Sequence, residues 1–381
     1  MRTLSLSVLS ALVPALLVAG TCGAQDATAR LFEQNDKDKD GKLSREEFPP
    51  RAQRMFGRID ANGDGFVTPQ EDRAFRRGRQ GQPGGAGRAP EGVTVQRNIP
   101  YAGTDNPRQM LDLVLPAKPA GEKPLPVIAW IHGGGWRGGS KGGGVGRIAR
   151  HVASGRYAGV SIGYRLSGEV IWPAQIHDCK AAIRWIRANA KRHNLNGERI
   201  AVWGSSAGGH LVAMLGTSGG VKALEGEIGP HKGASSRVAC VLDWFGPTDF
   251  LQMDAHALKG ARLVHDAAQS PESLLIGGAI QDHKDKAATA NPITYVSQDD
   301  PPFLIAHGTA DPLVPCHQSE LLAAALRKAG VDVTLIKMTG AGHGFGSAEL
   351  DRRVGLFLDK HLHGKAAEIS AEPIRPEPRR R

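Results

Sequence analysis

The chain has 381 residues, which allows one large domain with a small appendage. Its formal net charge is +10, yet no motif of a nucleic-acid-binding fold accompanies this charge, so we expect no nucleic-acid partner. Many arginines lie in a Gly-, Pro- and Gln-rich segment and at the end of the chain: Arg73, Arg76, Arg77, Arg79, Arg88, Arg375, Arg379, Arg380 and Arg381. We interpret them as solvated, with weak attraction to an anionic polymer or surface as the alternative.

Residues 1–24 have the pattern of a secretory signal peptide. Met1-Arg2 gives a positive start, residues 4–19 are apolar, and small residues lead to Ala24. A membrane anchor fits less well, because the apolar run is short and contains Pro14. The residues before Cys22 are also a poor signal for lipid attachment. No later segment is apolar enough to span a bilayer, so we expect an exported protein, periplasmic or extracellular, without a transmembrane segment.

Two twelve-residue stretches then have the ligand spacing of calcium loops. Residues 36–47 and 60–71 each place oxygen-bearing side chains at positions one, three and five, glycine at six and glutamate at twelve. The expected ligands are Asp36, Asp38, Asp40, the Lys42 carbonyl and Glu47, and then Asp60, Asn62, Asp64, the Phe66 carbonyl and Glu71. Leu43 and Val67 stand where paired loops form a short β-bridge. The stretches resemble an EF-hand pair over residues 28–77, which implies two Ca²⁺ sites of structural purpose in a small all-α domain.

Breaker residues divide the rest of the chain. Pro49-Pro50 must shorten the helix that leaves the first loop, because proline does not fit a helix interior. Residues 78–92 are rich in glycine and predict a flexible linker. Residues 364–381 are rich in Ala, Glu, Pro and Arg and predict a disordered basic tail.

Strand-like and helix-like segments alternate between these two stretches. Residues 93–101 and 110–115 are expected to pair antiparallel at one edge of a sheet. Further apolar runs predict strands at 126–131, 159–164, 199–203, 238–244, 302–307 and 331–338, and helical patterns lie at 174–192 and 319–329. This alternation predicts an α/β domain over residues 93–363, with a mostly parallel sheet covered on both faces.

Ser206 lies in Gly204-Ser205-Ser206-Ala207-Gly208, between the run 199–203 and the helical stretch 210–215. Glycines on both sides permit a sharp bend from strand to helix, which holds the Ser206 hydroxyl clear of the sheet. A Gly- and Ser-rich surface loop is the alternative, but it does not account for the flanking strand and helix. The pattern therefore predicts a nucleophilic serine.

A second glycine motif, His132-Gly133-Gly134-Gly135-Trp136, ends the strand at 126–131. Adjacent glycines leave backbone N–H groups unshielded, and acyl transfer needs such donors for its tetrahedral oxyanion. The residue after the nucleophile, Ala207, is expected to supply another donor. The alternative is a flexible glycine loop, and the position at a strand end favours the oxyanion role.

A serine hydroxyl needs a base, and the base needs a partner that fixes its tautomer. Asp311 and His343 follow consecutive strands and should lie at the same sheet edge as Ser206. Asp299 and Asp300 precede their strand and should lie at its wrong end. The remaining histidines, His132, His210 and His307, are assigned to packing, hydrogen bonding or bracing of the glycine loop.

Together these motifs resemble the α/β-hydrolase esterases. The glycine motif, Gly-Ser-Ser-Ala-Gly-Gly-His, the run 307–315 and Gly-Ala-Gly-His-Gly are similar to the hormone-sensitive-lipase-like group and nearer to the bifunctional feruloyl and acetyl-xylan esterase type. The resemblance implies a doubly wound sheet and a serine carboxylesterase acting on short acyl or aryl esters of carbohydrate, through an acyl-serine intermediate and without a cofactor for the chemistry. It implies Ser206 as nucleophile, His343 as base and Asp311 as its orienter, with Gly134, Gly135 and Ala207 as oxyanion donors.

Three questions stay open at this stage. A lipase or peptidase would use the same triad, and the EF-hands leave room for a non-catalytic, calcium-dependent glycan-binding protein. The segment 245–300, with Trp244, Asp249, Met253 and residues 274–276, is expected to form a lid or pocket wall, while Trp136, Trp172 and Trp203 are more often core. Cys179, Cys240 and Cys316 allow either one disulfide or three reduced thiols.

Overall fold

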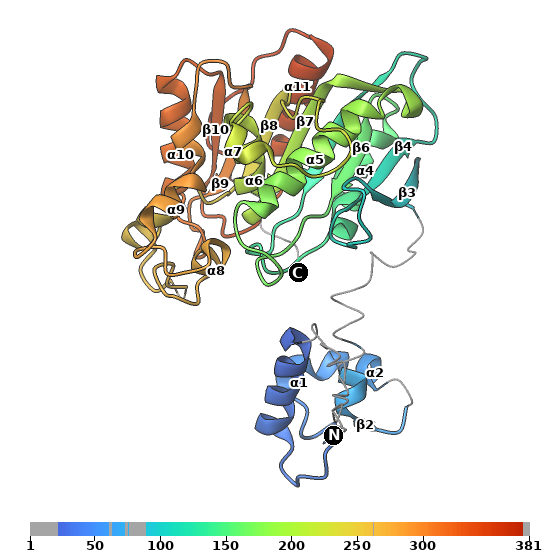
Figure 1. The fold of residues 1–381 in the computed structure, drawn as a ribbon, viewed down its shortest axis with the longest axis vertical. Helices are drawn as coiled ribbons and strands as arrows, with labels where there is room; N and C mark the ends of the chain where they lie inside the picture. The colour runs from blue at the N-terminus through green and yellow to red at the C-terminus, as the bar shows by residue number, and fades with distance from the viewer. Residues whose placement is uncertain (1–21, 61–62, 73–74, 76–88, 262, 376–381) are drawn as a thin grey trace, which may run out of the picture. The chain divides into compact units, whose positions relative to one another are not determined.

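The computed structural model describes residues 22–60, 63–72, 75, 89–261 and 263–375 (Figure 1). The chain forms two compact units, Met1–Gln82 and Pro83–Arg381, and each is described by itself. Most of the predicted signal peptide and of the predicted linker lies outside the described residues. Residues 22–24 belong to helix α1 (Cys22–Asn35). In the part of the chain that is described, no helix has the length and apolar character needed to span a membrane.

The small unit contains two loops flanked by helical segments. The first loop follows α1, and the second follows the 3-10 helix η1 (Pro50–Met55) and helix α2 (Phe56–Ile59). Strands β1 (Leu43–Ser44) and β2 (Phe66–Val67) join the loops, with Leu43 opposite Val67 as predicted. Residues 45–47 form only a turn before Pro49, because the two prolines end any helix there. Apolar side chains from both halves form the core of this unit: Phe32, Leu43, Phe48, Phe56, Ile59 and Val67.

The large unit is built on an eight-stranded sheet with the order β10-β9-β8-β7-β5-β6-β4-β3. Its strands are β3 (Val93–Pro100), β4 (Met110–Pro116), β5 (Leu125–Ile131), β6 (Ala158–Ile162), β7 (Leu195–Ser205), β8 (Cys240–Trp244), β9 (Phe303–Gly308) and β10 (Val333–Met338). Strand β4 is antiparallel to both β3 and β6, and the remaining pairs are parallel. Strands β5, β6, β8 and β9 are buried at every residue, as expected for parallel strands covered on both faces.

Helices cover both faces of this sheet, so the predicted doubly wound α/β fold is confirmed (Figure 1). Buried residues of α5 (Ala174–Ala188), α6 (Ala207–Thr217) and α10 (His317–Lys328) pack in one core with Val127 and Ile131. Those of α4 (Gly144–Ala153) and α11 (Ala348–His363) pack in a second core with Ile128 and Trp130. Alternate residues of β5 thus face opposite cores. The shorter elements are α7 (Lys222–Glu225), α8 (Pro271–Ile276), α9 (Lys284–Thr289), and the 3-10 helices η2 (Lys141–Gly143), η3 (Lys191–His193), η4 (Phe250–Gln252), η5 (Asp254–His256) and η6 (Pro292–Tyr295).

The prediction of a disordered tail over residues 364–381 is wrong for residues 364–375. Ile374 forms a parallel bridge with Met338 and is buried in the second core. Arg353 of α11 donates hydrogen bonds to the carbonyls of Ser370 and Glu372, at 2.8 and 2.7 Å. A polar segment with one buried anchor has no periodicity, and therefore its composition alone suggested disorder. Residues 376–381 lie outside the described part.

Cys179, Cys240 and Cys316 are free thiols. Cys179 and Cys240 are fully buried, and Cys316 is half-buried. Burial raises the pKa of each thiol, that of Cys316 to about 11, so all three remain protonated near neutral pH. Of the two alternatives, the reduced state is the one present.

Candidate active site and calcium loops

Ser206 lies at the turn between β7 and α6 with φ 57° and ψ −126°, a conformation that non-glycine residues rarely adopt. Its backbone N–H donates to the Trp244 carbonyl at 2.9 Å. The glycines on either side of Ser206 are required because a side chain at these positions would collide with the backbone. A Cβ on Gly204 would lie 2.2 Å from the Gly208 carbonyl oxygen, and one on Gly208 would lie 2.2 Å from that of Ile131. The bend therefore requires glycine at positions 204 and 208, because any side chain there would collide with a backbone oxygen.

The glycine loop after β5 lies against this turn. A Cβ on Gly133 would be 3.3 Å from the Cβ of Ser206. Gly134 and Gly135 have φ 117° and 58°, values that favour glycine. In the described structure, the N–H groups of Gly134, Gly135 and Ala207 donate to no backbone carbonyl, and all three residues line the cavity that contains Ser206. The predicted oxyanion donors therefore border the serine.

His343 and Asp311 form a close pair at the ends of β10 and β9. Nδ1–H of His343 donates to Asp311 Oδ2 at 2.7 Å, while Asp311 Oδ1 accepts from the N–H groups of Leu313 and Val314 at 2.8 and 3.0 Å. Burial raises the pKa of Asp311, but hydrogen bonds from His307 and His343 outweigh it and hold the pKa well below its usual range. The carboxylate therefore stays ionised, and Nε2 of His343 is left to accept a proton.

Ser206 and His343 line one cavity of about 800 Å³. No hydrogen bond joins the Ser206 hydroxyl to the imidazole of His343. The ring of Phe245 packs on that imidazole with 4.5 Å between centroids. The serine, the imidazole and the carboxylate thus lie at one rim of the sheet, but the serine and the imidazole are not hydrogen-bonded. Catalytic hydrogen bonds are often long before substrate binds, so this geometry does not argue against the triad.

The competing histidines have structural surroundings. His307 is fully buried, donates from Nε2 to the Val314 carbonyl at 2.9 Å, and accepts at Nδ1 from the Ser319 hydroxyl at 2.7 Å. Its Nε2 also lies 3.4 Å from Asp311 Oδ2. His307 therefore packs beside the carboxylate of Asp311 and does not line the cavity.

His210 and His132 are buried as well. The ring of His210 packs edge-on against Trp136, with its Nε2 2.6 Å from the Ala290 carbonyl oxygen. His132 stacks on Tyr164 with 4.2 Å between centroids, and its Nδ1 lies 2.9 Å from the Gly133 carbonyl oxygen. Burial lowers the pKa of both histidines to about 4. His132 braces the glycine loop, as predicted.

The rival carboxylates are also accounted for. Asp299 forms an ion pair with Arg237 at 2.7 Å. Asp300 accepts from the N–H of Ser297 at 3.0 Å. Both residues precede β9, and neither lines the cavity. They lie at the wrong end of their strand, as expected.

The segment 245–300 supplies one wall of the cavity, but not with the residues that the sequence singled out. Met253, Leu275 and Ile276 are core, and Asp249 caps η4. Trp136 lines the cavity, whereas Trp172 and Trp203 do not. The wall residues are Phe245, Pro247, Leu263, His265, Pro271 and Glu272.

A buried ion pair in this wall was missed by the sequence analysis. Nδ1 of His265 lies 3.1 Å from Glu272 Oε1, and both side chains are nearly inaccessible to solvent. Burial lowers the pKa of His265, but the carboxylate of Glu272 and other neighbours raise it above its ordinary value. A histidine and a glutamate seven residues apart in an irregular insertion match no motif, so no sequence signal pointed to them.

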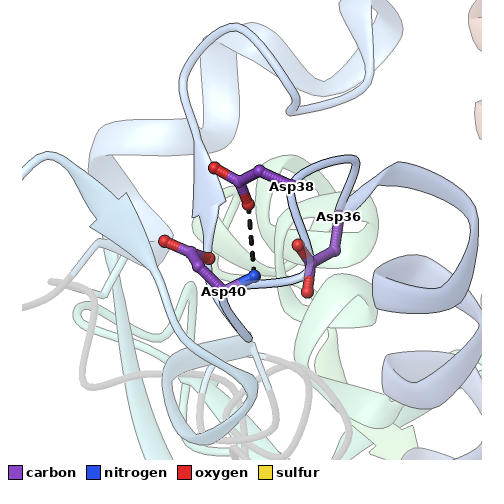
Figure 2. Close-up of side chains that lie close together, drawn as sticks. All are labelled: Asp36, Asp38 and Asp40. Atoms are coloured by element: carbon purple, nitrogen blue, oxygen red, sulfur yellow. Dashed lines mark hydrogen bonds between the residues drawn. The ribbon is translucent and has the colours of Figure 1, made fainter.

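The loop of residues 36–47 gathers its acidic side chains around one point (Figure 2). One carboxylate oxygen from each of Asp36, Asp38 and Asp40 lies within 4.8 Å of the other two. The Asp36 Oδ1 atom is buried without a hydrogen-bond partner. Glu47 accepts from the N–H groups of Lys37 and Ser44, both at 3.0 Å, and these bonds lower its pKa. Hard oxygen donors in this arrangement fit Ca²⁺.

The second loop repeats the hydrogen bonds of the first. Asp60 Oδ2 accepts from Gly65 N–H at 3.1 Å, as Asp36 Oδ2 does from Gly41 N–H at 3.0 Å. The closing glutamate, Glu71, accepts from Thr68 as Glu47 does from Ser44. Asp64 Oδ1 accepts from Phe66 N–H at 2.9 Å. Asn62 lies outside the described residues, and the ligand roles of the Lys42 and Phe66 carbonyls stay predictions.

Family models match both units. The BD-FAE model matches residues 111–326, and the EF hand model matches residues 29–48 and 52–71. The EF-hand pair predicted from the two loops is therefore present.

Similar proteins of known class are esterases. Esterase LipC of Mycobacterium tuberculosis (strain ATCC 25618 / H37Rv) is 32% identical over 287 residues, which cover 73% of this chain and 68% of LipC. Esterase LipQ of the same strain is 31% identical over 251 residues, covering 65% of this chain and 56% of LipQ. The solved structure of a truncated carbohydrate esterase from gut microbiota superposes with TM-score 0.66 at 34% identity, covering 71% of this chain and 96% of that one. A bifunctional GH43-CE protein of Bacteroides eggerthii gives TM-score 0.64 at 36% identity, covering 70% and 35%.

Proposed function

This chain belongs to the BD-FAE family of α/β-hydrolases and is an esterase, and from that premise we propose that it hydrolyses short acyl or aryl esters of carbohydrate through an acyl-serine intermediate. The observation that carries the proposal is the 2.7 Å bond between His343 and Asp311 at the cavity that also contains Ser206. The proposal that the ester is one of a carbohydrate is supported by the similarity to a carbohydrate esterase. A cavity of about 800 Å³ is also large enough for a sugar unit.

Each residue of the site has a separate role in the proposed reaction. Ser206 Oγ attacks the ester carbonyl carbon while Nε2 of His343 takes the hydroxyl proton, and Asp311 remains ionised and stabilises the imidazolium. The N–H groups of Gly134, Gly135 and Ala207 donate to the oxyanion. When the tetrahedral intermediate collapses, the alcohol leaves with the proton from His343. Water then attacks the acyl-serine, its proton passes through His343 to Ser206, and the free acid departs.

Replacing the nucleophile tests this assignment. Ser206→Ala is expected to lower kcat on p-nitrophenyl acetate by about 10⁴-fold or more, because the covalent route is lost. The matched control is Ser205→Ala, a change of the same size at the preceding position, which should retain most of the wild-type rate. Activity that survives in Ser206→Ala would refute the nucleophile.

A substrate series distinguishes the remaining alternatives. We expect turnover of acetylated xylan or methyl ferulate and no steep rise with acyl length. A steep rise would favour a lipase. Absence of turnover with all short esters, together with tight calcium-dependent glycan binding, would favour the non-catalytic alternative.

We also propose that the EF-hand pair binds two Ca²⁺ ions in a structural role. The carboxylates of Asp36, Asp38, Asp40 and Glu47 would hold one ion, and Asp60, Asn62, Asp64 and Glu71 the other, with the Lys42 and Phe66 carbonyls completing the sites. Bound Ca²⁺ would neutralise the acidic loops. The two-stranded bridge of Leu43 and Val67 would then hold the pair together.

Export after cleavage near Ala24 completes the proposal, and it is supported by the signal pattern of residues 1–24. The basic segments would add weak attraction to anionic polymers outside the cell. N-terminal sequencing of the protein from the medium or periplasm tests the cleavage site.

A further inference from the structure

Glu272 is a charged side chain in the wall of the cavity that the proposed mechanism does not use. It lies in the first turn of α8, is 3% exposed, and lines the same cavity as Ser206 and His343. The helix start adjoins the glycine loop, since a Cβ on Gly135 would lie 3.3 Å from the Cβ of Pro271. Glu272 therefore lines the cavity that an ester bound at Ser206 would enter.

This carboxylate lies at ion-pair distance from His265 but receives no hydrogen bond from it. Oε1 lies 3.1 Å from Nδ1 of His265, yet that nitrogen and Oε2 of Glu272 are both buried and have no hydrogen-bond partner. The backbone that carries His265 is fixed, because Asp254 accepts from the N–H groups of His265 and Asp266, both at 2.8 Å. Oε2 of Glu272 thus lies beside an anchored segment and has no hydrogen-bond donor.

A buried carboxylate oxygen without a donor is costly, and the cost is recovered when a donor binds. Two kinds of donor could approach, a cation or a neutral hydroxyl. Arg137 and Arg147 line the same cavity and are exposed, so their charge disfavours a cationic ligand. A neutral donor therefore fits this cavity better than a cation, and a hydroxyl is the neutral donor that a carbohydrate ester carries.

We propose that Glu272, held by His265, accepts a hydrogen bond from a hydroxyl group of the bound ester and so selects hydroxylated esters over plain ones. This inference rests on the proposed esterase function of the same cavity. The hydroxyl belongs either to a sugar in the alcohol part of the ester or to an aromatic ring in its acyl part, and the two sources share the same chemistry.

Two matched substrate pairs test the proposal on the full-length protein. The first pair is a mono-acetylated methyl xyloside and cyclohexyl acetate, and the second is methyl 4-hydroxycinnamate and methyl cinnamate. Glu272→Ala is expected to lower kcat/KM for the hydroxylated member of one pair by about 10- to 100-fold, the range of a hydrogen bond to a charged group. The hydroxyl-free member should change by less than about twofold. The affected pair identifies which part of the ester carries the hydroxyl.

Two further variants separate recognition from structure. Glu272→Gln should give a smaller loss of the same selectivity, because an amide oxygen still accepts a hydrogen bond but carries no charge. Asp254→Asn, which weakens the anchor of the segment that carries His265 and does not touch the cavity, should reduce the same selectivity by less than Glu272→Ala does. Equal losses for both members in Glu272→Ala, or no loss, would overturn the proposal while leaving the esterase function intact. A wild-type protein inactive on all four esters and on p-nitrophenyl acetate would instead contradict the proposed function itself.

Discussion

Two buried aspartates of the large unit have pKa values shifted in opposite directions, and their surroundings explain the difference. Asp243, at the end of β8, accepts one hydrogen bond from the N–H of Gly246 at 3.0 Å, and its second oxygen has no partner. Burial therefore raises the pKa of Asp243 to about 6. Asp311 is equally buried, but two imidazoles and two backbone N–H groups face it, so its pKa falls. Hydrogen-bond donors, and not depth, therefore set the direction in which each pKa shifts.

We expect Asp243→Asn to remove a loss of folding stability that the wild type suffers when Asp243 ionises at higher pH. Because the pKa of Asp243 is higher in the folded protein than in the unfolded chain, its favourable contribution is complete below about pH 4 and is lost as pH rises through about 6. The variant stays neutral and should exceed the wild type in free energy of unfolding above pH 7 by about 2–3 kcal/mol, at 1.36 kcal/mol per pKa unit. Urea unfolding at pH 4.5 and 7.5 measures this. A difference that does not grow with pH would contradict the assignment.

At the scale of single residues, the sequence predicted the site residues that directly follow a strand. Ser206, Asp311 and His343 each follow an apolar run, so the parallel order of the strands places them at one edge. His265 and Glu272 lie in an irregular segment, where sequence spacing gives no information about distance. Their pairing depends on tertiary packing, and only the structure reveals it.

At the scale of elements, the bend from β7 to α6 leaves no room for a side chain at its glycines. We expect Gly208→Ala to lose most activity and several kcal/mol of stability, because its Cβ would lie 2.2 Å from the Ile131 carbonyl oxygen. Gly146→Ala in α4 is the control, since nothing lies within 4 Å of its Cβ. That variant should gain about 0.5–1 kcal/mol through helix propensity. Thermal unfolding and p-nitrophenyl acetate turnover measure both, and a well-folded, active Gly208→Ala protein would contradict the steric argument.

The ordered segment after α11 covers the edge of the sheet at β10. Truncation after Gly364 is expected to destabilise the large unit, because it removes Ile374 from the core and leaves Arg353 without the carbonyls of Ser370 and Glu372. Loss of the Ile374 side chain alone corresponds to about 2–3 kcal/mol.

Truncation after Arg375 is the matched control and should leave the melting temperature unchanged. Calorimetry of the two shortened proteins compares them. Equal melting temperatures would show that the segment 364–375 adds nothing to stability.

Elements differed in how well the sequence predicted them. The strands were found because buried β-branched runs stand out between breakers, and α5 and α10 because their apolar residues recur at helical spacing. Helix α4 begins within the glycine-rich stretch that follows the glycine motif, and no helix was predicted there. The segment 364–375 was misjudged because its backbone hydrogen bonds, not its composition, fix it to β10 and α11.

At the scale of the whole molecule, the proposed calcium ligands lie in one unit and the residues assigned to catalysis lie in the other. We expect a calcium chelator to lower thermal stability more than it lowers the initial rate at low temperature. The acidic side chains of Asp36, Asp38 and Asp40 repel one another without an ion, whereas the groups assigned to catalysis lie in the large unit. Calorimetry and initial rates, each with Ca²⁺ or with EDTA, measure the two effects.

Substitution of the closing glutamates provides the control for this experiment. Glu47→Gln with Glu71→Gln should reproduce the effect of the chelator on thermal stability, with no further response to EDTA. An immediate, large loss of rate in a protein that is still folded would instead make calcium catalytic or regulatory.

The three free thiols of the large unit have a consequence for how this protein is made and handled. Cys179, Cys240 and Cys316 form no covalent cross-link, so the large unit keeps its shape by non-covalent packing alone. Dithiothreitol should therefore leave it intact, and its folding needs no oxidant or disulfide isomerase. A fold of this kind can mature equally well in a reducing cytosol and in an oxidising exterior.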